Sequence, residues 1–150
     1  MAYQDSFQSP LGPVTVTSKD GTAINDVSFA PATSSQSCAV TQQAKQQLMD
    51  YFNGRRQSFD LPLEPAGTAF QQQVWQALLS IEHGRTASYG EIAQTIRNPK
   101  AMRAVGMANS RNPIAIIIPC HRIIGANGTL TGYAGGLDKK EWLLQHERAR

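Results

Sequence analysis

A turn-rich connector at residues 55–67 is the feature that most constrains how this chain can fold. It contains Pro62, Pro65 and Gly67. Proline has no backbone N–H and is poorly accommodated inside a helix or a central strand. We therefore expect the 150 residues to form two lobes, residues 1–66 with the connector and residues 67–150.

The two parts carry different patterns of secondary structure. In the first part, a β-branched run at 14–17 is followed by the turn signal Lys19-Asp20-Gly21, which predicts strands in a hairpin, and residues 39–53 predict a helix. In the second part, capping-box pairs begin two helices: Thr68 with Gln71, and Ser88 with Glu91. The fold class is therefore α+β, with a small N-terminal sheet lobe and a mainly helical C-terminal lobe.

A third helix is expected over residues 99–110. Asn98 would cap it and Pro99 would take its first position. Together with a short helix at about 90–96 it makes a helix-turn-helix pattern. Small residues would form its buried stripe: Ala101, Ala104, Val105 and Ala108.

The opposite face of this helix carries Lys100, Arg103 and Met107, with Arg111 just beyond it. The second helix of such a motif can enter a DNA groove. A surface of small residues suits close approach better than base readout, so we expect sequence-tolerant binding in the minor groove with Arg103 as the inserted cation. The pattern alone leaves open that the two helices simply pack together.

Charge is distributed unevenly along the chain. Residues 1–82 hold four basic and seven acidic residues, whereas residues 83–150 hold ten basic and four acidic ones. No acidic residue occurs between Ile92 and Gly136. A one-sided positive charge attracts a polyanion such as DNA, although a solvated basic face would give the same count.

A cysteine follows the most apolar segment of the second part. Residues 114–118 are Ile-Ala-Ile-Ile-Ile, which predicts a buried strand or extended segment, and Pro119 ends it directly before Cys120. His121 and Arg122 supply a base and a cation, the two groups that activate a thiol. Adjacent residues of an extended chain point to opposite sides, so the same pattern also fits an inert buried thiol beside a core histidine.

The remaining features concern the compartment. Cys38 and Cys120 are the two cysteines, too few for a disulfide framework or an all-cysteine zinc site. The N-terminus does not resemble a signal peptide, and no run of 18 apolar residues occurs. We expect free thiols, a cytoplasmic protein and no membrane partner.

The segment Ile118–Ile124 closely resembles the active-site signature of the O6-alkylguanine-DNA alkyltransferases. Further segments resemble the family in the same order, and the strong match covers residues 67–147, while the N-terminal lobe, including Ser9–Gly12, matches in outline only. These segments are Ser88–Ala93, Arg103–Gly106, Asn112-Pro113, Gly132–Leu137 and Glu141–Leu144. The resemblance implies a ribonuclease-H-like N-terminal lobe in outline. It also implies one-way, single-use transfer of an alkyl group from guanine O6 to the protein, and it leaves open whether thymine O4 is a second substrate.

By resemblance, Cys120 is the nucleophile and alkyl acceptor. His121 is implied as its base, acting through a bound water, and Glu147 as the carboxylate that orients His121; Glu141 is the other acid available near the C-terminus. Tyr89 is implied to donate toward guanine N3 and to help rotate the 3′ phosphate.

The resemblance also implies how double-stranded DNA with an alkylated base is held by a monomer. The base leaves the duplex and Arg103 fills the vacated stack. Implied DNA contacts are Tyr89, Lys100, Arg103, Ala104, Gly106 and Arg111. Implied substrate-pocket residues are Asn112, which braces the turn of the active site, and Ile123, Tyr133, Ala134 and Gly135; the family usually has serine or another small residue at the position of Ala134.

Departures from the family and rival functions complete the expectations. Certain members of the family bind a structural zinc ion through Cys and His in the N-terminal lobe. Here that lobe has one cysteine, Cys38, and no histidine occurs before His83, so we expect no zinc and no other cofactor. A non-enzymatic relative that only binds alkylated DNA would lack Cys120. A cysteine hydrolase would leave the helix-turn-helix pattern unexplained, and a DNA-binding regulator would leave the Pro-Cys-His-Arg run without a role.

Overall fold

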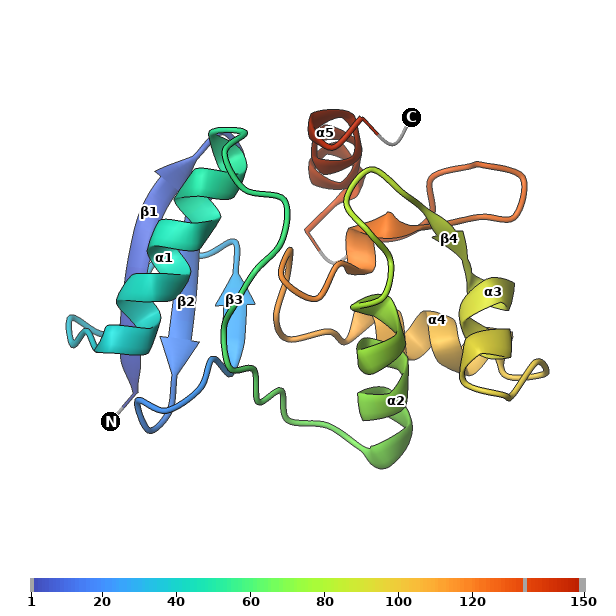
Figure 1. Ribbon diagram of the computed structural model, residues 1–150, viewed down its shortest axis with the longest axis horizontal. Coiled ribbons are helices and arrows are strands. Elements are labelled where there is room, and N and C mark those ends of the chain that lie inside the picture. The colour runs from blue at the N-terminus through green and yellow to red at the C-terminus, as the bar shows by residue number, and fades with distance from the viewer. Residues whose placement is uncertain (1, 134, 149–150) are drawn as a thin grey trace. The chain divides into compact units, whose positions relative to one another are not determined.

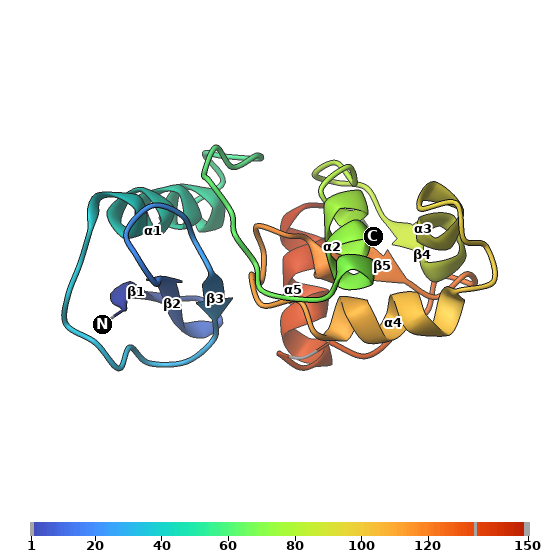
Figure 2. The same cartoon turned by 90° about the horizontal axis from the view of Figure 1, so that it is seen from below.

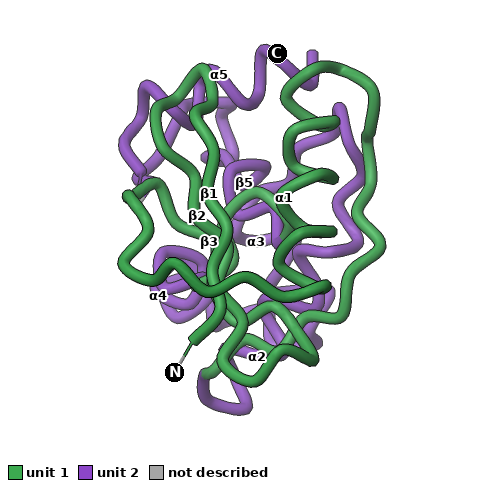
Figure 3. Tube along the Cα trace, turned by 90° about the vertical axis from the view of Figure 1, so that its left-hand side faces the viewer, with its two compact units in different colours: residues 1–66, 113–117 green, residues 67–112, 118–150 purple. Residues whose placement is uncertain are grey.

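The computed structural model describes residues 2–133 and 135–148 (Figure 1). These residues form two compact units: residues 2–66 with 113–117, and residues 67–112 with 118–148 (Figure 3). No helix in the described ranges is long and apolar enough to cross a membrane. The mixture of a small sheet and a helical part confirms the α+β class.

The first unit is a three-stranded antiparallel sheet covered by one helix. Its elements are β1 (Tyr3–Ser9), β2 (Gly12–Ser18), β3 (Asp26–Ser28) and α1 (Ala39–Phe52). Figure 2 shows α1 along one face of the sheet, against β1 and β2. Val14 and Val16 of β2 and Ala44 and Leu48 of α1 are fully buried there. The expected strands, hairpin turn and helix are all present, because the apolar positions alternate in β2 and recur every three to four residues in α1.

The apolar segment 114–118 is buried as expected but is not a strand. Val27 of β3 donates to Pro113 O at 2.9 Å and accepts from Ala115 N at 3.2 Å, so only Ile114 bridges to the sheet. Residues 115–117 then turn, and Ile116 has φ of 70°. The strand prediction is wrong, because an apolar run records burial and does not by itself distinguish an extended chain from a turn.

The second unit consists of short helices around a small parallel ladder. Its elements are α2 (Ala69–Leu78), β4 (Ala87–Ser88), α3 (Tyr89–Thr95), α4 (Met102–Ser110), the 3₁₀ turn η1 (Cys120–Arg122), β5 (Ile123–Ile124) and α5 (Leu137–His146). Both predicted capping boxes are formed, at Thr68 and at Ser88. Helix α2 packs on α3 and α4, and α5 packs on η1.

The third predicted helix begins later than expected. Ala101 N donates to Asn98 O at 3.0 Å, so residues 98–101 form a turn and α4 starts at Met102. Proline suits the second position of such a turn as well as the first position of a helix, and the turn forms here. Val105 and Ala108 are buried as predicted, but Ala101 is half-buried and Ala104 is exposed, so the buried stripe is narrower than the sequence indicated.

Candidate active site

Cys120 lies at the start of a single 3₁₀ turn. Ile118, at 1% exposure, accepts a hydrogen bond from Cys120 N at 2.8 Å, and Pro119 precedes the turn. The turn replaces the extended chain that would have sent Cys120 and His121 to opposite sides. The thiol itself is buried, with 6% of the residue exposed.

Burial decides the protonation of Cys120. It raises the pKa of the thiol, while a hydrogen bond from the Asn112 side chain and the positive charge of Lys140 act in the opposite direction. The net shift is upward. The resting cysteine is therefore a thiol, and a base has to take its proton before the sulfur can act as a nucleophile.

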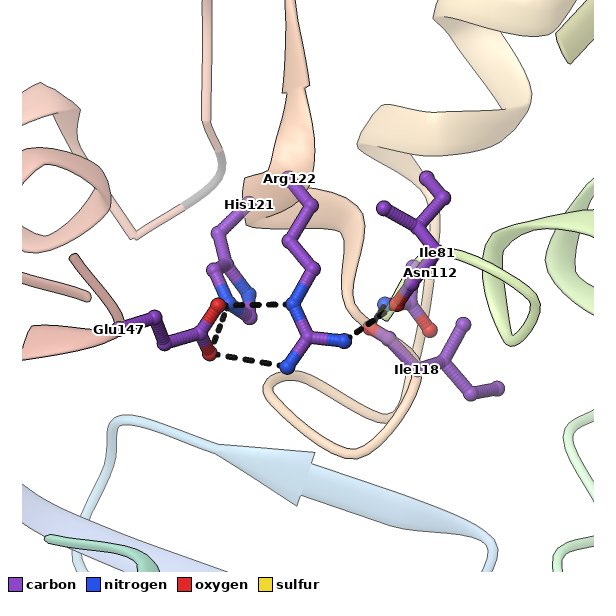
Figure 4. A network of polar contacts seen from close by, with 6 residues as sticks. All are labelled: Ile81, Asn112, Ile118, His121, Arg122 and Glu147. Atoms are coloured by element: carbon purple, nitrogen blue, oxygen red, sulfur yellow. Dashed lines mark hydrogen bonds and ion pairs between the residues drawn. The ribbon is translucent and has the colours of Figure 1, made fainter. Parts of the chain in front are cut away.

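The base next to Cys120 is held by a buried carboxylate (Figure 4). His121 Nε2 lies 2.8 Å from Glu147 Oε2, and neither side chain is exposed to solvent. A carboxylate only accepts hydrogen bonds, so Nε2 carries the hydrogen. Burial lowers the pKa of His121 despite the opposing effect of Glu147, so the imidazole is neutral at pH 7.

The other imidazole nitrogen of His121 remains available. His121 Nδ1 is buried and has no hydrogen-bond partner among the described residues. With the hydrogen on Nε2, this atom presents a lone pair. A neutral imidazole oriented by a carboxylate and offering a buried lone pair has the form of a general base.

Arg122 fixes the carboxylate in turn. Its Nε donates to Glu147 Oε1 at 2.8 Å and its Nη2 to Glu147 Oε2 at 3.0 Å, while Nη1 donates to Ile81 O at 2.6 Å (Figure 4). Burial alone would raise the pKa of Glu147, but the hydrogen bonds from His121 and Arg122 outweigh it and hold that pKa far below its ordinary value. The sequence indicated Glu147 as a partner of His121; the part played by Arg122 was not predicted.

A second polar network joins Tyr89 to Thr131 and Lys140. The strands β4 and β5 pair in parallel, with Ala87 opposite Ile123. Strand β5 follows η1 in the chain, and Tyr89 begins α3 directly after β4. Tyr89 OH lies 2.6 Å from Thr131 Oγ1. Lys140 Nζ donates to Thr131 O at 3.2 Å and to Thr131 Oγ1 at 3.4 Å.

Sequence reasoning missed Thr131 and Lys140. Lys140 is fully buried although it is charged. It shares the inner side of α5 with Leu143 and Leu144, and Glu147 follows at the same spacing. The sequence signal that could have revealed Lys140 is that two charged residues, Lys140 and Glu147, occupy the same helical face as the apolar Leu143 and Leu144. Asn109 was also missed: it is 3% exposed, and its Nδ2 donates to Cys120 O at 3.4 Å.

The predicted pocket residues surround η1 in part. Ile123 is fully buried, and Asn112 Nδ2 donates to Ile118 O at 2.7 Å, which braces the turn (Figure 4). Burial raises the pKa of Tyr133 well above its ordinary value, and negative charge on Cys120 or Glu147 would raise it further. Gly135 is half-buried, and Ala134 lies outside the described residues.

The predicted DNA contacts occupy the outer side of the helical unit. Lys100, Arg103, Ala104 and Arg111 are exposed. Met102 and Met107, at 49% and 60% exposure, extend the same surface. Gly106 is different: it is half-buried, and a Cβ placed on it would contact the Tyr89 ring at 3.6 Å. Among the described residues, no group of three or more His, Cys, Asp and Glu side chains could hold a metal ion.

Comparison with known proteins identifies the class to which this fold and site belong. Residues 69–149 match the family model "6-O-methylguanine DNA methyltransferase, DNA binding domain", and residues 2–65 match "6-O-methylguanine DNA methyltransferase, ribonuclease-like domain". The chain therefore belongs to the 6-O-methylguanine DNA methyltransferase family.

Individual relatives agree over nearly the whole length. The chain is 50% identical to the methylated-DNA–protein-cysteine methyltransferase of Methanosarcina acetivorans over 97% of each protein. It is similar to the crystal structure of Mycobacterium tuberculosis O6-methylguanine methyltransferase, with 44% identity, a TM-score of 0.88, and coverage of 100% of this chain and 94% of that one. The crystal structure of Mycobacterium tuberculosis OGT in complex with DNA matches at 46% identity and the same TM-score over 98% of this chain and 93% of that one.

Proposed function

We propose that this protein repairs DNA by moving the alkyl group of O6-alkylguanine onto Cys120. The observation that carries the proposal is the buried Cys120 beside a neutral, carboxylate-held His121 in a chain of this family. The Cys120 sulfur attacks the alkyl carbon, the carbon–oxygen bond breaks, and its electron pair stays on the guanine. The new thioether is not reversed by thiol exchange, so each molecule acts once.

The proton of Cys120 passes to His121 in this scheme. His121 Nδ1 takes it through one bridging water, and Glu147, fixed by Arg122, stabilises the imidazolium that forms. The negative charge that develops on guanine is neutralised by a proton from Tyr89 to N3. Cys120 needs His121 as a base because burial makes its thiol a weaker acid in the protein than in water.

DNA is held by the outer side of the helical unit, with residues 67–150 as the domain that binds DNA and transfers the alkyl group. Arg103 and Ala104 enter the minor groove from α4, Gly106 allows Tyr89 to lie close to that helix, and Lys100 and Arg111 contact phosphates. Arg103 then replaces the flipped base, which enters a pocket formed with Asn112, Ile123, Tyr133, Ala134 and Gly135. If so, Arg103→Ala slows repair of duplex DNA more than reaction with the free alkylated base; equal slowing of both would remove this role.

We also infer a cytoplasmic location. A single-use thiol has to stay reduced until it meets damage, and the cytoplasm is a reducing compartment.

The test is to find where the alkyl group goes. Incubation with a duplex that contains O6-methylguanine, followed by digestion and mass spectrometry, should place one methyl group on the peptide containing Cys120. The chain offers a matched control: Cys38→Ala should react normally, whereas Cys120→Ala should still bind the duplex and gain no methyl group. A wild-type protein that leaves the Cys120 peptide unmodified contradicts the proposed function.

A further inference from the structure

A buried lysine behind the candidate active site has no carboxylate partner in the described hydrogen bonds and ion pairs. Lys140 Nζ donates to Thr131 O at 3.2 Å and to Thr131 Oγ1 at 3.4 Å. The residue is fully buried, and burial lowers the pKa of Lys140 to about 8, against a smaller opposing effect of Cys120. An ammonium group kept out of water without a counter-ion is costly, so its position requires an explanation.

The contacts of this network allow one chain of donors that runs from Lys140 through Thr131 to Tyr89, because either oxygen of the contact between Thr131 Oγ1 and Tyr89 OH can donate. An ammonium group only donates, so Lys140 occupies a lone pair of Thr131 Oγ1. A hydroxyl has one hydrogen, and that of Thr131 is then free to point at the Tyr89 oxygen 2.6 Å away. Tyr89 accepts from Thr131 in this arrangement, which leaves the phenol hydrogen available for a substrate atom.

We propose that Thr131 and Lys140 form a proton relay that resupplies Tyr89 during alkyl transfer. The proposal rests on the function proposed above, in which Tyr89 protonates the departing guanine. As the phenol proton moves to guanine N3, the Thr131 hydroxyl proton moves to the Tyr89 oxygen and a Lys140 proton moves to Thr131 Oγ1. Lys140 ends neutral, Tyr89 and Thr131 end unchanged, and no tyrosinate is left beside the newly formed guanine.

The acidity of the groups supports this direction. An ammonium whose pKa is about 8 is a stronger acid than an ordinary phenol, whose pKa is about 10. Removal of the positive charge from Lys140 also relieves the cost of burying it. In the relay Thr131 acts through Tyr89, so Thr131 is a positioning residue, and Lys140 is the proton source.

The variants separate the hydroxyl from the shape of Thr131. Thr131→Val keeps the size of the side chain and removes the hydroxyl, whereas Thr131→Ser keeps the hydroxyl. We expect Thr131→Val to slow single-turnover methyl transfer by about tenfold, less than the roughly 100-fold at the lower end for general acid–base catalysis, because Tyr89 keeps its own proton. Thr131→Ser should restore most of the rate. Thr131→Ala serves the same purpose if the valine variant does not fold.

A double-mutant cycle tests whether Thr131 acts through Tyr89. In a Tyr89→Phe background, Thr131→Val should have no further effect on the rate, and its effect should shrink in a Lys140→Met background. A valine variant as fast as the wild type would overturn the relay, and so would a slowing factor for Thr131→Val that is the same with and without the Tyr89 hydroxyl. Wild-type protein serves as the reference throughout, because its failure to methylate Cys120 would count against the proposed function instead.

The pH profile supplies a readout that packing alone would not change. The titratable groups that act on Lys140 are Cys120 and His121 of η1, and Tyr89 acts through Thr131. Wild-type transfer should lose the relay's contribution as pH rises through about 8, where Lys140 becomes neutral. The Thr131→Val protein should show no such loss; the same alkaline decline in both proteins would contradict the relay.

Discussion

At the scale of single residues, the site depends on a buried carboxylate that is held by neighbouring side chains. Glu147 is 3% exposed and accepts from both His121 and Arg122. A buried charge that loses its partner is far more costly than a surface charge that does so, because no water replaces the lost contacts. The same carboxylate therefore contributes to stability and to the tautomer of His121.

Glu147→Gln should lower both stability and activity. It leaves the Arg122 guanidinium buried without a counter-ion, which should cost about 3–5 kcal/mol in urea unfolding. It also removes the group that keeps the hydrogen on His121 Nε2, so methyl transfer to Cys120 should slow. Glu64→Gln, a change at an exposed residue, is the control and should change the free energy of unfolding by no more than about 0.5 kcal/mol.

The stabilisation by Glu147 should depend on pH. The pKa of Glu147 is lower in the folded protein than its ordinary value of 4.5. Its contribution is therefore complete above about pH 4.5 and declines as pH falls below that value. The free energy of unfolding, measured from pH 7 downward, should differ less and less between the wild type and Glu147→Gln as the solution becomes acidic. A difference that stays constant would mean that these contacts do not lower the pKa of Glu147.

At the scale of elements, short helices are fixed at their ends and by a few close approaches. Helix α2 begins with the Thr68 capping box and buries Trp75, whose Nε1 donates to Ala108 O of α4 at 2.8 Å. Gly67 lies directly before the cap. A Cβ on Gly67 would lie 2.5 Å from a ring carbon of Trp75 and 2.7 Å from Gln71 Oε1.

Gly67→Ala should therefore loosen the start of α2. Either the Trp75 ring or the cap has to move, and we expect a loss of about 1–3 kcal/mol in thermal or chemical unfolding. Gly132→Ala is the matched control, because a Cβ at Gly132 has no atom within 4 Å and no positive φ is required there. Equal stability of the two alanine variants would show that the Trp75 ring can give way at no cost.

At the scale of the whole molecule, the order of residues along the chain and the compact units do not coincide. The segment 113–117 is part of the first unit, although residues 67–112 and 118–148 on either side of it belong to the second. Ile114 and Ile116 of this segment are buried. The backbone N–H and C=O of Val27 both form hydrogen bonds with the segment. A fragment that lacks residues 1–66 keeps every candidate site residue, but segment 113–117 loses Val27 and the rest of the first unit.

A fragment of residues 67–150 should therefore be unstable or aggregate, because Ile114, Ile116 and Ile117 become exposed. Supplying residues 1–66 as a second chain should restore soluble protein, as measured by gel filtration and by methyl transfer. A 67–150 fragment as stable as the full chain would show that the first unit is not needed to bury this segment.

The elements were accessible from sequence because they depend on local patterns, whereas the candidate site residues were inferred from the resemblance to the family. The Thr68 and Ser88 caps, the burial of β2 and the inner side of α1 follow from spacing alone. The start of α4 and the form of segment 114–118 were not, because Asn-Pro begins turns as readily as helices and an apolar run specifies burial without conformation. The pairing of β4 with β5, two residues each, carries no sequence signal at all.

The sequence by itself determined that the chain carries a thiol, a base and a carboxylate at positions that resemble the family's pattern, and that the second part of the chain is basic. Only the tertiary structure decided how they are combined. Cys120 and His121 lie in one buried 3₁₀ turn, burial keeps His121 neutral and Cys120 protonated, and Arg122 fixes the carboxylate. Thr131 contacts Tyr89 across 42 residues of chain, and Lys140 contacts Thr131 across 9. The physical reason is that protonation and hydrogen-bond direction depend on neighbours in space and on exclusion of water, and neither is set by spacing along the chain.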